Sequence, residues 1–152
     1  EVGDRWMVAL AHHNLANAAR AREDYAGARA EYAESLRIYR DYADRWALAL
    51  LLEDIVVLAG LLDAPEHALE LLGFADTLRR GCESPRGDEL EAELETGLER
   101  AVALLDPAAR AAARDLGRTL ELGSGAQLAL DFLVVVDPGE RRYARNRGTA
   151  GR

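Results

Sequence analysis

The chain repeats itself after forty residues, and this repeat constrains its fold more than any other feature. The triplet Asp4-Arg5-Trp6 recurs as Asp44-Arg45-Trp46. At the same offset small residues align with small ones and large apolar residues with large apolar ones: Ala9/Ala49, Leu10/Leu50, Leu15/Ile55, Ala19/Ala59, Ala28/Ala68, Tyr32/Leu72 and Ile38/Leu78. Such self-similarity is typical of repeat proteins, in which each unit is one supersecondary structure that stacks on the next.

The first unit, residues 4–43, is predicted to form two helices. Asp4 is placed to cap the first helix and Asp24 to cap the second. The apolar residues of the first helix, at roughly helical spacing, are Trp6, Leu10, Leu15 and Ala19. Those of the second follow one stripe of a 3.6-residue period and are Tyr25, Ala28, Tyr32, Leu36 and Tyr39. We therefore expect an antiparallel helical hairpin.

The second unit, residues 44–83, is predicted to form the same structure. Asp44 is placed to cap a helix to about residue 62, and Pro65 suits the first position of the next helix. Residues 47–62 are apolar nearly all round, which indicates a helix sandwiched between neighbours. The small residues expected where helix axes approach closely are Ala19, Ala28, Ala59 and Ala68.

Three further helices are predicted after a loop at residues 81–87. Asp88 with Glu91 resembles a capping box for the fifth, to about residue 105, and Asp106 precedes Pro107 at the start of the sixth, to about residue 117. Ser124 with Gln127 suggests a capping box for a short last helix ending near residue 133. The expected fold is thus all-α, with about seven helices and a domain over residues 1–133 whose closing helices span 88–133.

Residues 134–152 are rich in Arg and Gly, and we expect a flexible tail there. The run at residues 133–136 suits either a short strand or the end of a helix, and the sequence does not decide between them.

The bulk composition excludes several classes of partner. A formal net charge of −8 repels polyanions, so direct nucleic-acid binding is not expected. The chain has no run near the roughly 18 apolar residues of a membrane span, and Cys82 alone cannot form an internal disulfide, as suits a reducing cytoplasm. It begins without Met or signal-peptide features, which suggests a piece of a longer cytoplasmic protein. All basic residues are Arg, as in GC-rich bacterial genomes.

The pattern within each unit resembles the tetratricopeptide signature. The residues that carry the likeness are Leu15-Ala16, Ala19, Tyr25, Ala28 and Tyr32, and in the second unit Ile55-Val56, Ala59, Ala68 and Leu72. Two departures are the bulky Val56 and the forty-residue spacing, against about 34 in the family. The resemblance implies hairpins stacked as a right-handed solenoid.

The longer spacing and the repeated Asp-Arg-Trp look like the C-terminal arrays of large ATP-binding bacterial transcriptional regulators of the STAND type, LuxR/MalT-like. Residues 71–79 and 117–120 resemble the closing segment of such arrays, so the likeness covers about residues 4–130. Their ATP-binding and DNA-binding motifs are absent from this sequence. The resemblance implies a protein–protein interaction or sensory scaffold domain that binds a protein segment or its own regulatory domains. A domain that binds a small-molecule inducer is the alternative, and a homo-oligomer remains open.

Transfer of the tetratricopeptide positions places four polar residues on the inner face of the stack. These are His13, Asn17, Arg20 and Glu53, and the resemblance implies that they hold an extended or helical peptide. The alternative is that they are ordinary residues of exposed helices.

No residue pattern indicates catalysis. The histidines are His12, His13 and His67, without metal-ligand spacing, and we expect them to be partly exposed helix residues. Gly123-Ser124-Gly125 lacks the Lys of a phosphate-binding loop. We therefore expect no enzymatic activity, no metal and no cofactor.

Overall fold

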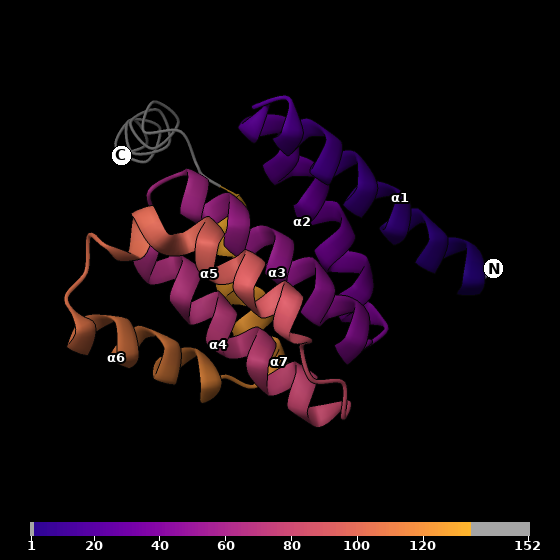
Figure 1. Cartoon of the computed structure of the whole chain (residues 1–152). Helices are drawn as coiled ribbons and strands as arrows, with labels where there is room; N and C mark the ends of the chain where they lie inside the picture. Colours follow the sequence, from indigo (N-terminus) through magenta and orange to yellow (C-terminus); the bar gives the residue numbers. More distant parts are fainter. Residues whose placement is uncertain (1, 135–152) are drawn as a thin grey trace, which may run out of the picture.

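The computed structural model describes residues 2–134, and these form seven α-helices without a strand among them (Figure 1). The helices are α1 (Val2–Ala21), α2 (Tyr25–Asp41), α3 (Arg45–Leu61), α4 (Pro65–Gly81), α5 (Asp88–Val102), α6 (Pro107–Arg118) and α7 (Leu122–Leu133). The expected all-α class is confirmed. The predicted tail lies outside the described residues except for Val134, and α7 ends at Leu133, so of the undecided run 133–136 only the first two residues are described.

The first four helices each end in a similar turn, and these four turns stand twenty residues apart in the sequence. In each turn one residue other than glycine has a left-handed backbone: Glu23 (φ 62°), Ala43 (φ 50°), Asp63 (φ 52°) and Glu83 (φ 52°). The N–H groups of Glu23 and Asp24 donate back to the carbonyls of Arg20 and Ala19, both at 3.0 Å, and the other three turns repeat these bonds. This is the Schellman motif, which satisfies the last carbonyls of one helix.

Two of these turns and the α5–α6 connection also supply the cap of the next helix. Asp24, Asp44 and Asp106 accept hydrogen bonds from the N–H groups of Gly27 (2.9 Å), Ala47 (3.0 Å) and Ala109 (2.8 Å). Pro65 and Pro107 begin α4 and α6. The predicted caps at Asp24, Asp44 and Asp106 are therefore confirmed.

Three other predicted caps are wrong. Because α1 begins at Val2, Asp4 lies inside its first turn. Gly87 precedes α5 without a side-chain cap, so Asp88 interacts with the helix dipole instead of capping. Ser124 lies inside α7, which begins at Leu122 because the α6–α7 turn is tight, and Gln127 donates to Asp131 Oδ1 at 2.8 Å.

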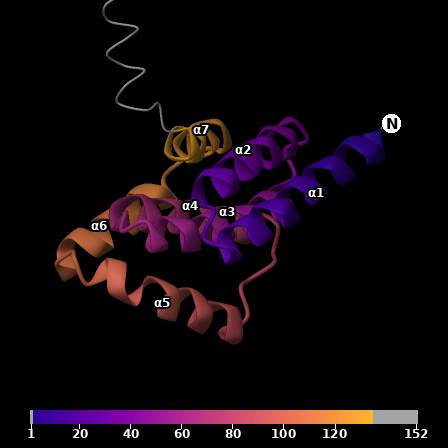
Figure 2. The ribbon, with the colours of Figure 1, turned by 90° about the horizontal axis from the view of Figure 1, so that it is seen from above.

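The helices form two packed hairpins and a closing segment. Helices α1 and α2 pack together, α3 and α4 pack together, and α2 joins the hairpins by packing on α3. Helix α5 lies on α3, whereas α6 packs along α4 and not along α5. Helix α7 returns across α2 and α4, so that α5 and α7 lie on opposite sides of the α3–α4 hairpin (Figure 2).

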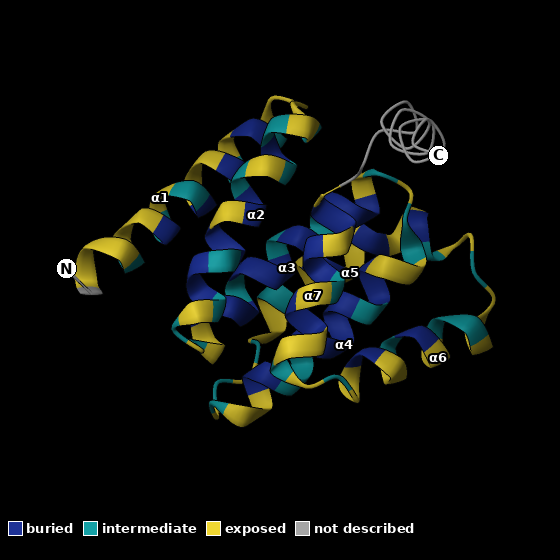
Figure 3. Cartoon of the chain, turned by 180° about the vertical axis from the view of Figure 1, so that it is seen from behind, coloured by how far each residue is buried: buried dark blue, intermediate teal, exposed yellow. Residues whose placement is uncertain are grey.

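Helix α3 is the centre of the core. Most of its residues are buried, and they cover about two thirds of the helix circumference. The remaining side carries Trp46, Leu50 and Asp54, and Figure 3 shows α3 in the interior of the molecule. The predicted sandwiched helix is thus confirmed. The small residues Ala28, Ala59 and Ala68 are fully buried, as expected for close helix approach. Over the described residues, no helix combines the length and hydropathy that a bilayer crossing requires.

One contact fastens α7 to the first hairpin. Arg29 on α2 donates to the carbonyl oxygen of Phe132 at 2.7 Å, and its guanidinium carbon lies 4.8 Å from the centre of the Phe132 ring. The ring of His67 on α4 lies 5.5 Å from the same phenyl ring. Phe132 therefore contacts side chains of both α2 and α4.

Candidate functional site

A groove of about 410 Å³ runs between α1 and α3. It is lined by both tryptophans, by apolar side chains and by polar residues of the two helices: Trp6, Leu10, His13, Asn14, Asn17, Tyr39, Trp46, Ala47, Leu50, Glu53, Asp54 and Leu90. This is the side that the tetratricopeptide resemblance implies as the inner face of the stack.

Asp54 lines this groove and binds three of the four predicted site residues, of which His13 and Asn17 also line the groove. Its Oδ2 lies 2.6 Å from His13 Nε2 and accepts a bond of 3.1 Å from Asn17 Nδ2. Arg20 binds the same residue twice, with Nη1 at 2.8 Å from the backbone oxygen and Nη2 at 3.3 Å from Oδ1. His13, Asn17 and Arg20 converge because residues at i, i+4 and i+7 share one side of a helix.

These four residues form the Asp54 cluster, which is also held from α2. Tyr32 on α2 donates its hydroxyl to Asn17 Oδ1 at 2.5 Å. Burial alone would raise the pKa of Asp54, but the hydrogen bonds from His13 and Asn17 and the charge of Arg20 outweigh it, so this pKa is lowered. Burial raises the pKa of Tyr32 well above its usual range. The cluster is therefore an ionised carboxylate in a fixed shell of donors.

The histidines differ in part from the expectation of partly exposed residues. His13 is buried, because it lies between Tyr32 on α2 and Asp54 on α3. His12 is half-buried, with Nδ1 2.6 Å from Glu31 Oε2. Over residues 2–134, no three His, Cys, Asp or Glu side chains gather in a way that would hold a metal ion.

The two tryptophans occupy equivalent repeat positions but have different surroundings. Trp6 packs on Tyr39, with ring centres 5.6 Å apart, and donates its Nε1–H to Asp44 Oδ2 at 3.1 Å. Forty residues later the positions of Tyr39 and Asp44 hold Arg and Ser. Trp46 is 48% exposed in consequence, and it presents a large apolar surface at the groove.

Glu53, the fourth predicted site residue, belongs to a different cluster. Its Oε1 accepts from Arg79 Nε at 2.8 Å and from Arg86 Nε at 2.7 Å, and its Oε2 accepts from Arg79 Nη2 at 2.7 Å. The side chains of Glu53, Arg79 and Arg86 are 5%, 9% and 6% exposed. Glu53 is thus committed to a buried ion pair at the far end of the groove.

Arg86 extends this Glu53 cluster to α5 and α4. Its Nη1 donates to Glu91 Oε2 at 2.7 Å, and its Nη2 lies 3.0 Å from Asp76 Oδ1, as an ion pair without hydrogen-bond geometry. Burial would lower the pKa of Arg86, but the carboxylates outweigh it and raise this pKa. Arg114 on α6 then binds Asp76 at 2.9 Å and Glu91 at 3.3 Å. The cluster therefore links α3, α4, α5 and α6.

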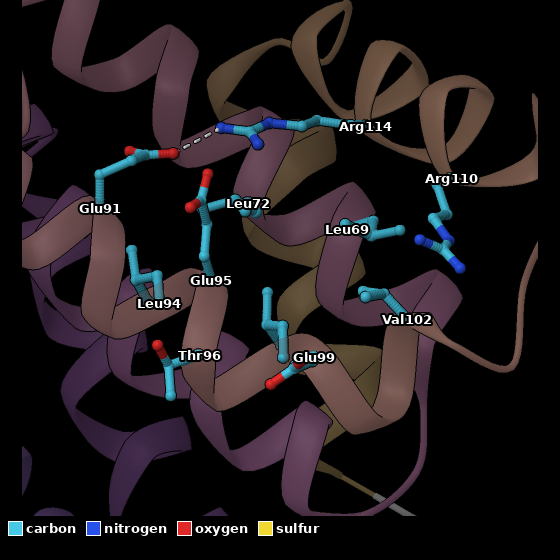
Figure 4. Close-up of a pocket in the computed structure, with 11 residues that line it drawn as sticks. Leu69, Leu72, Glu91, Leu94, Glu95, Thr96, Glu99, Val102, Arg110 and Arg114 are labelled. Atoms are coloured by element: carbon cyan, nitrogen blue, oxygen red, sulfur yellow. Dashed lines mark hydrogen bonds and ion pairs between the residues drawn. The ribbon is translucent and has the colours of Figure 1, made fainter. Parts of the chain in front are cut away.

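A second cavity, of about 460 Å³, lies between α5 and α6 above α4 (Figure 4). Its apolar lining consists of Leu69 and Leu72 of α4 and of Leu94, Leu98 and Val102 of α5. Glu91, Glu95 and Glu99 line the α5 side, and Arg110 and Arg114 line the α6 side. In Figure 4 the guanidinium group of Arg110 points toward Leu69 and Val102, while Arg114 pairs with Glu91.

Two glycines explain why α6 lies against α4. A Cβ on Gly73 would stand 2.0 Å from the carbonyl oxygen of Arg114, and a Cβ on Gly117 would stand 1.9 Å from that of Glu70. The backbones of α4 and α6 therefore approach closely, which draws α6 away from α5 and leaves the cavity. Sequence reasoning missed this cavity, although Gly73 inside one predicted helix was a usable signal. Gly117 was predicted only as the end of the sixth helix.

Comparison of the chain with models of protein families, with curated proteins and with solved structures gives no match. A function must therefore be argued from the groove, the cavity and the two clusters themselves.

Proposed function

We propose that this chain is a protein-binding helical-repeat domain, which serves as a sensory or scaffold domain of a bacterial transcriptional regulator. Its α1–α3 groove would hold a segment of a partner protein or of the regulator's own domains. In this proposal the two hairpins stack as a tetratricopeptide-like right-handed solenoid. The twenty-residue spacing of the four turns and the packing of α5 on α3 support that arrangement.

The observation that carries the proposal is the half-exposed Trp46 beside a polar cluster that is already satisfied. Tryptophan is enriched among the residues that dominate binding energy, because it buries a large area and loses few rotamers. Leu10, Leu50 and Leu90 are half-buried around it and supply further apolar surface. Because the Asp54 cluster is already fixed by internal bonds, its side chains would lose little conformational freedom when a peptide docks.

The cluster also changes the role expected of the predicted site residues. The polar atoms of His13, Asn17 and Arg20 are bound within the protein. We therefore propose that His13 and Asn17 shape the wall of the groove and that Arg20 holds Asp54 in place. Trp46 and the exposed Asn14 contact the peptide.

Selection of peptides from a display library on the purified chain tests this proposal. The chain has two Trp, and both line the groove, so their intrinsic fluorescence reports occupancy without a label. Selected peptides should shift this fluorescence, and Trp46→Ala should weaken their binding by roughly thirtyfold, as for a dominant interface residue. Binding can be measured by calorimetry in the variant.

Leu61→Ala is the matched control, because Leu61 lies on the same helix, is 44% exposed and is absent from the groove lining. This variant should bind as the parent does. Peptides whose affinity is equal in the parent and in Trp46→Ala would contradict the proposal.

The α5–α6 cavity favours a second candidate, the binding of a small-molecule inducer. Its volume of about 460 Å³ lies within the usual range of ligand pockets. The apolar lining between carboxylates and Arg110 suits a ligand with an apolar body and both a cationic and an anionic group. Such a ligand should raise stability by about 2.7 kcal/mol at a hundred times its dissociation constant.

A thermal-shift screen with zwitterionic metabolites separates the two candidates. A ligand in the cavity should lose its effect in Arg110→Ala and keep it in Trp46→Ala. A screen without any shift would remove the second candidate and leave the first untouched.

A further inference from the structure

The outer side of α1 carries an apolar stripe that the described residues leave uncovered. Val8, Ala11, Leu15 and Ala18 follow one another at helical spacing and are all exposed, Val8 to 46% and Leu15 to 55%. A stripe of this kind on the side of a helix is normally packed against a neighbour.

The internal repeat shows what such a neighbour would be. Forty residues later the same four positions hold Leu48, Leu51, Ile55 and Leu58, and each of these is 0% exposed. Leu51 and Leu58 lie three residues before and four residues after Asp54, so they are its neighbours on the helix surface. The carboxylate of Asp54 reaches α1 and α2 packs on α3, so this side of α3 faces the first hairpin. The stripe on α1 is therefore the equivalent of the surface by which α3 stacks on α2.

The spacing of the turns is an independent indication of such a neighbouring hairpin. The left-handed residues Glu23, Ala43, Asp63 and Glu83 stand twenty residues apart, and one further step back falls on Gly3. Gly3 is followed by Asp4, as Glu23 and Ala43 are followed by the capping residues Asp24 and Asp44. Glycine is the residue most favoured at the left-handed position of a Schellman turn. In this structure Gly3 is helical, and nothing lies within 4 Å of the place where its Cβ would be.

We propose that the outer side of α1 seats a further helical hairpin of the same forty-residue type, directly preceding Gly3 in the same polypeptide. Its second helix stacks on Val8, Ala11, Leu15 and Ala18 as α2 stacks on α3, and a Schellman turn at Gly3-Asp4 joins it to α1. This surface is separate from the groove, so the inference does not depend on the proposed peptide binding.

The test supplies the missing hairpin from the chain itself. A second copy of residues 4–43 is fused directly to the N-terminal side of Asp4, so that the junction reproduces the sequence from Ala43 to Trp46. A second version also carries Ala11→Leu and Ala18→Leu in the inner copy, which gives the junction the larger side chains of α3. Amide hydrogen exchange is then compared with that of the 152-residue chain.

Stacking should slow exchange in the inner α1 by roughly tenfold or more, because opening then requires the new interface to break. Leu15→Glu in the inner copy should cancel this gain, yet leave the thermal midpoint of the 152-residue chain unchanged. Leu61→Glu, at an exposed residue elsewhere, should leave the gain intact.

Two results would overturn the proposal. One is an added hairpin that exchanges freely in both versions, with no change in the inner α1. The other is self-association of the 152-residue chain in sedimentation that Leu15→Glu abolishes, since a second copy would then cover this surface.

Discussion

Glu53 and Asp54 are neighbours on α3, and each is the centre of a different interface. Asp54 reaches back to α1 of the first hairpin, where it binds His13, Asn17 and Arg20, and its side chain is 29% exposed. Glu53 reaches forward to Arg79 and to Arg86 in the loop before α5, and its side chain is 5% exposed. One helix thus joins the units on both sides through adjacent carboxylates.

The repeat makes the comparison closer. Glu53 occupies the same place in its unit as His13, and both side chains point toward the following unit. His13 meets the carboxylate of Asp54 in the following unit. Glu53 meets the guanidinium group of Arg86, which follows its own unit. The positions of the helices are therefore repeated, whereas the side chains that form the two interfaces differ.

The largest expected effect is on the forward interface, in which Glu53 binds Arg79 and Arg86. Glu53→Ala leaves Arg79 and Arg86 as buried cations that have lost their shared carboxylate, which should cost about 3–5 kcal/mol of unfolding free energy. Urea denaturation followed by circular dichroism measures it. Glu95→Ala removes the same charge from an exposed position of α5 and should change stability little. Equal stability of the two variants would show that the cluster contributes nothing.

The backward interface, in which Asp54 binds residues of α1, should be weaker. Asp54→Ala removes the acceptor of three donors, and we expect a loss of about 1.5–3 kcal/mol, below that of Glu53→Ala because water reaches Asp54. Glu93→Ala, on the exposed side of α5, is its control. If Asp54→Ala were the more damaging variant in urea denaturation, the backward interface would be the stronger of the two.

The forward side also depends on backbone contact. In Gly73→Ala the new methyl group meets the α6 backbone, so α6 must shift, at a cost of about 1–3 kcal/mol. Gly97→Ala is the matched control, because nothing lies within 4 Å of its Cβ position, and it should stabilise helix α5 by about 0.5–1 kcal/mol. Faster amide exchange confined to α6 in Gly73→Ala would locate the effect, and parental exchange there would refute it.

Acid should weaken both interfaces in one pH range. The pKa values of Asp54, Asp76 and Glu91 are lowered in the folded chain, because their hydrogen bonds and arginine partners outweigh burial. The stability that they add is complete above the unfolded values of about 4 and is lost as pH falls further. The temperature of the thermal midpoint should therefore fall as the pH is lowered below about 4. It should fall less steeply with pH in Asp76→Asn, because an amide at this position no longer titrates. An unchanged slope in that variant would exclude Asp76 as a source.

The smallest effect concerns the turns that both units share. Ala43 has a left-handed backbone (φ 50°), which costs a residue with a Cβ about 1–2 kcal/mol. Ala43→Gly removes this strain but adds about 0.5–1 kcal/mol of unfolded-state entropy, so a net gain of roughly 0.5–1 kcal/mol is expected. Ala30→Gly, inside α2 and exposed, should instead lose about 1 kcal/mol. A destabilised Ala43→Gly would mean that the turn is not strained.

These two interfaces also explain what could be predicted from the sequence. The hairpins and the caps at Asp24 and Asp44 follow from local spacing and from the repeat, so they were accessible. The resemblance pointed to His13, Asn17 and Arg20, and these three residues do meet at one place, around Asp54. Their common partner Asp54 was not foreseen, because side-chain pairing across two units leaves no local pattern.

The forward interface was largely inaccessible to sequence reasoning. Arg86 lies in a loop outside the repeat, and nothing in its neighbourhood indicates that it would bind Glu53. The packing of α6 on α4 depends on Gly73 and Gly117 meeting each other's helix backbone, which is a contact between distant segments. The cavity between α5 and α6 follows from these two features, so it could not be predicted without them.

The return of α7 across α2 and α4 has a mechanical consequence. In a stack in which each hairpin contacts only its neighbours, the stack can bend or twist at the interfaces between hairpins. In this chain Phe132 is tied to Arg29 on one hairpin and packs near His67 on the other, so sliding between the hairpins would have to break these contacts. The two hairpins should consequently move as one rigid body, so that a displacement of one hairpin is transmitted to the other.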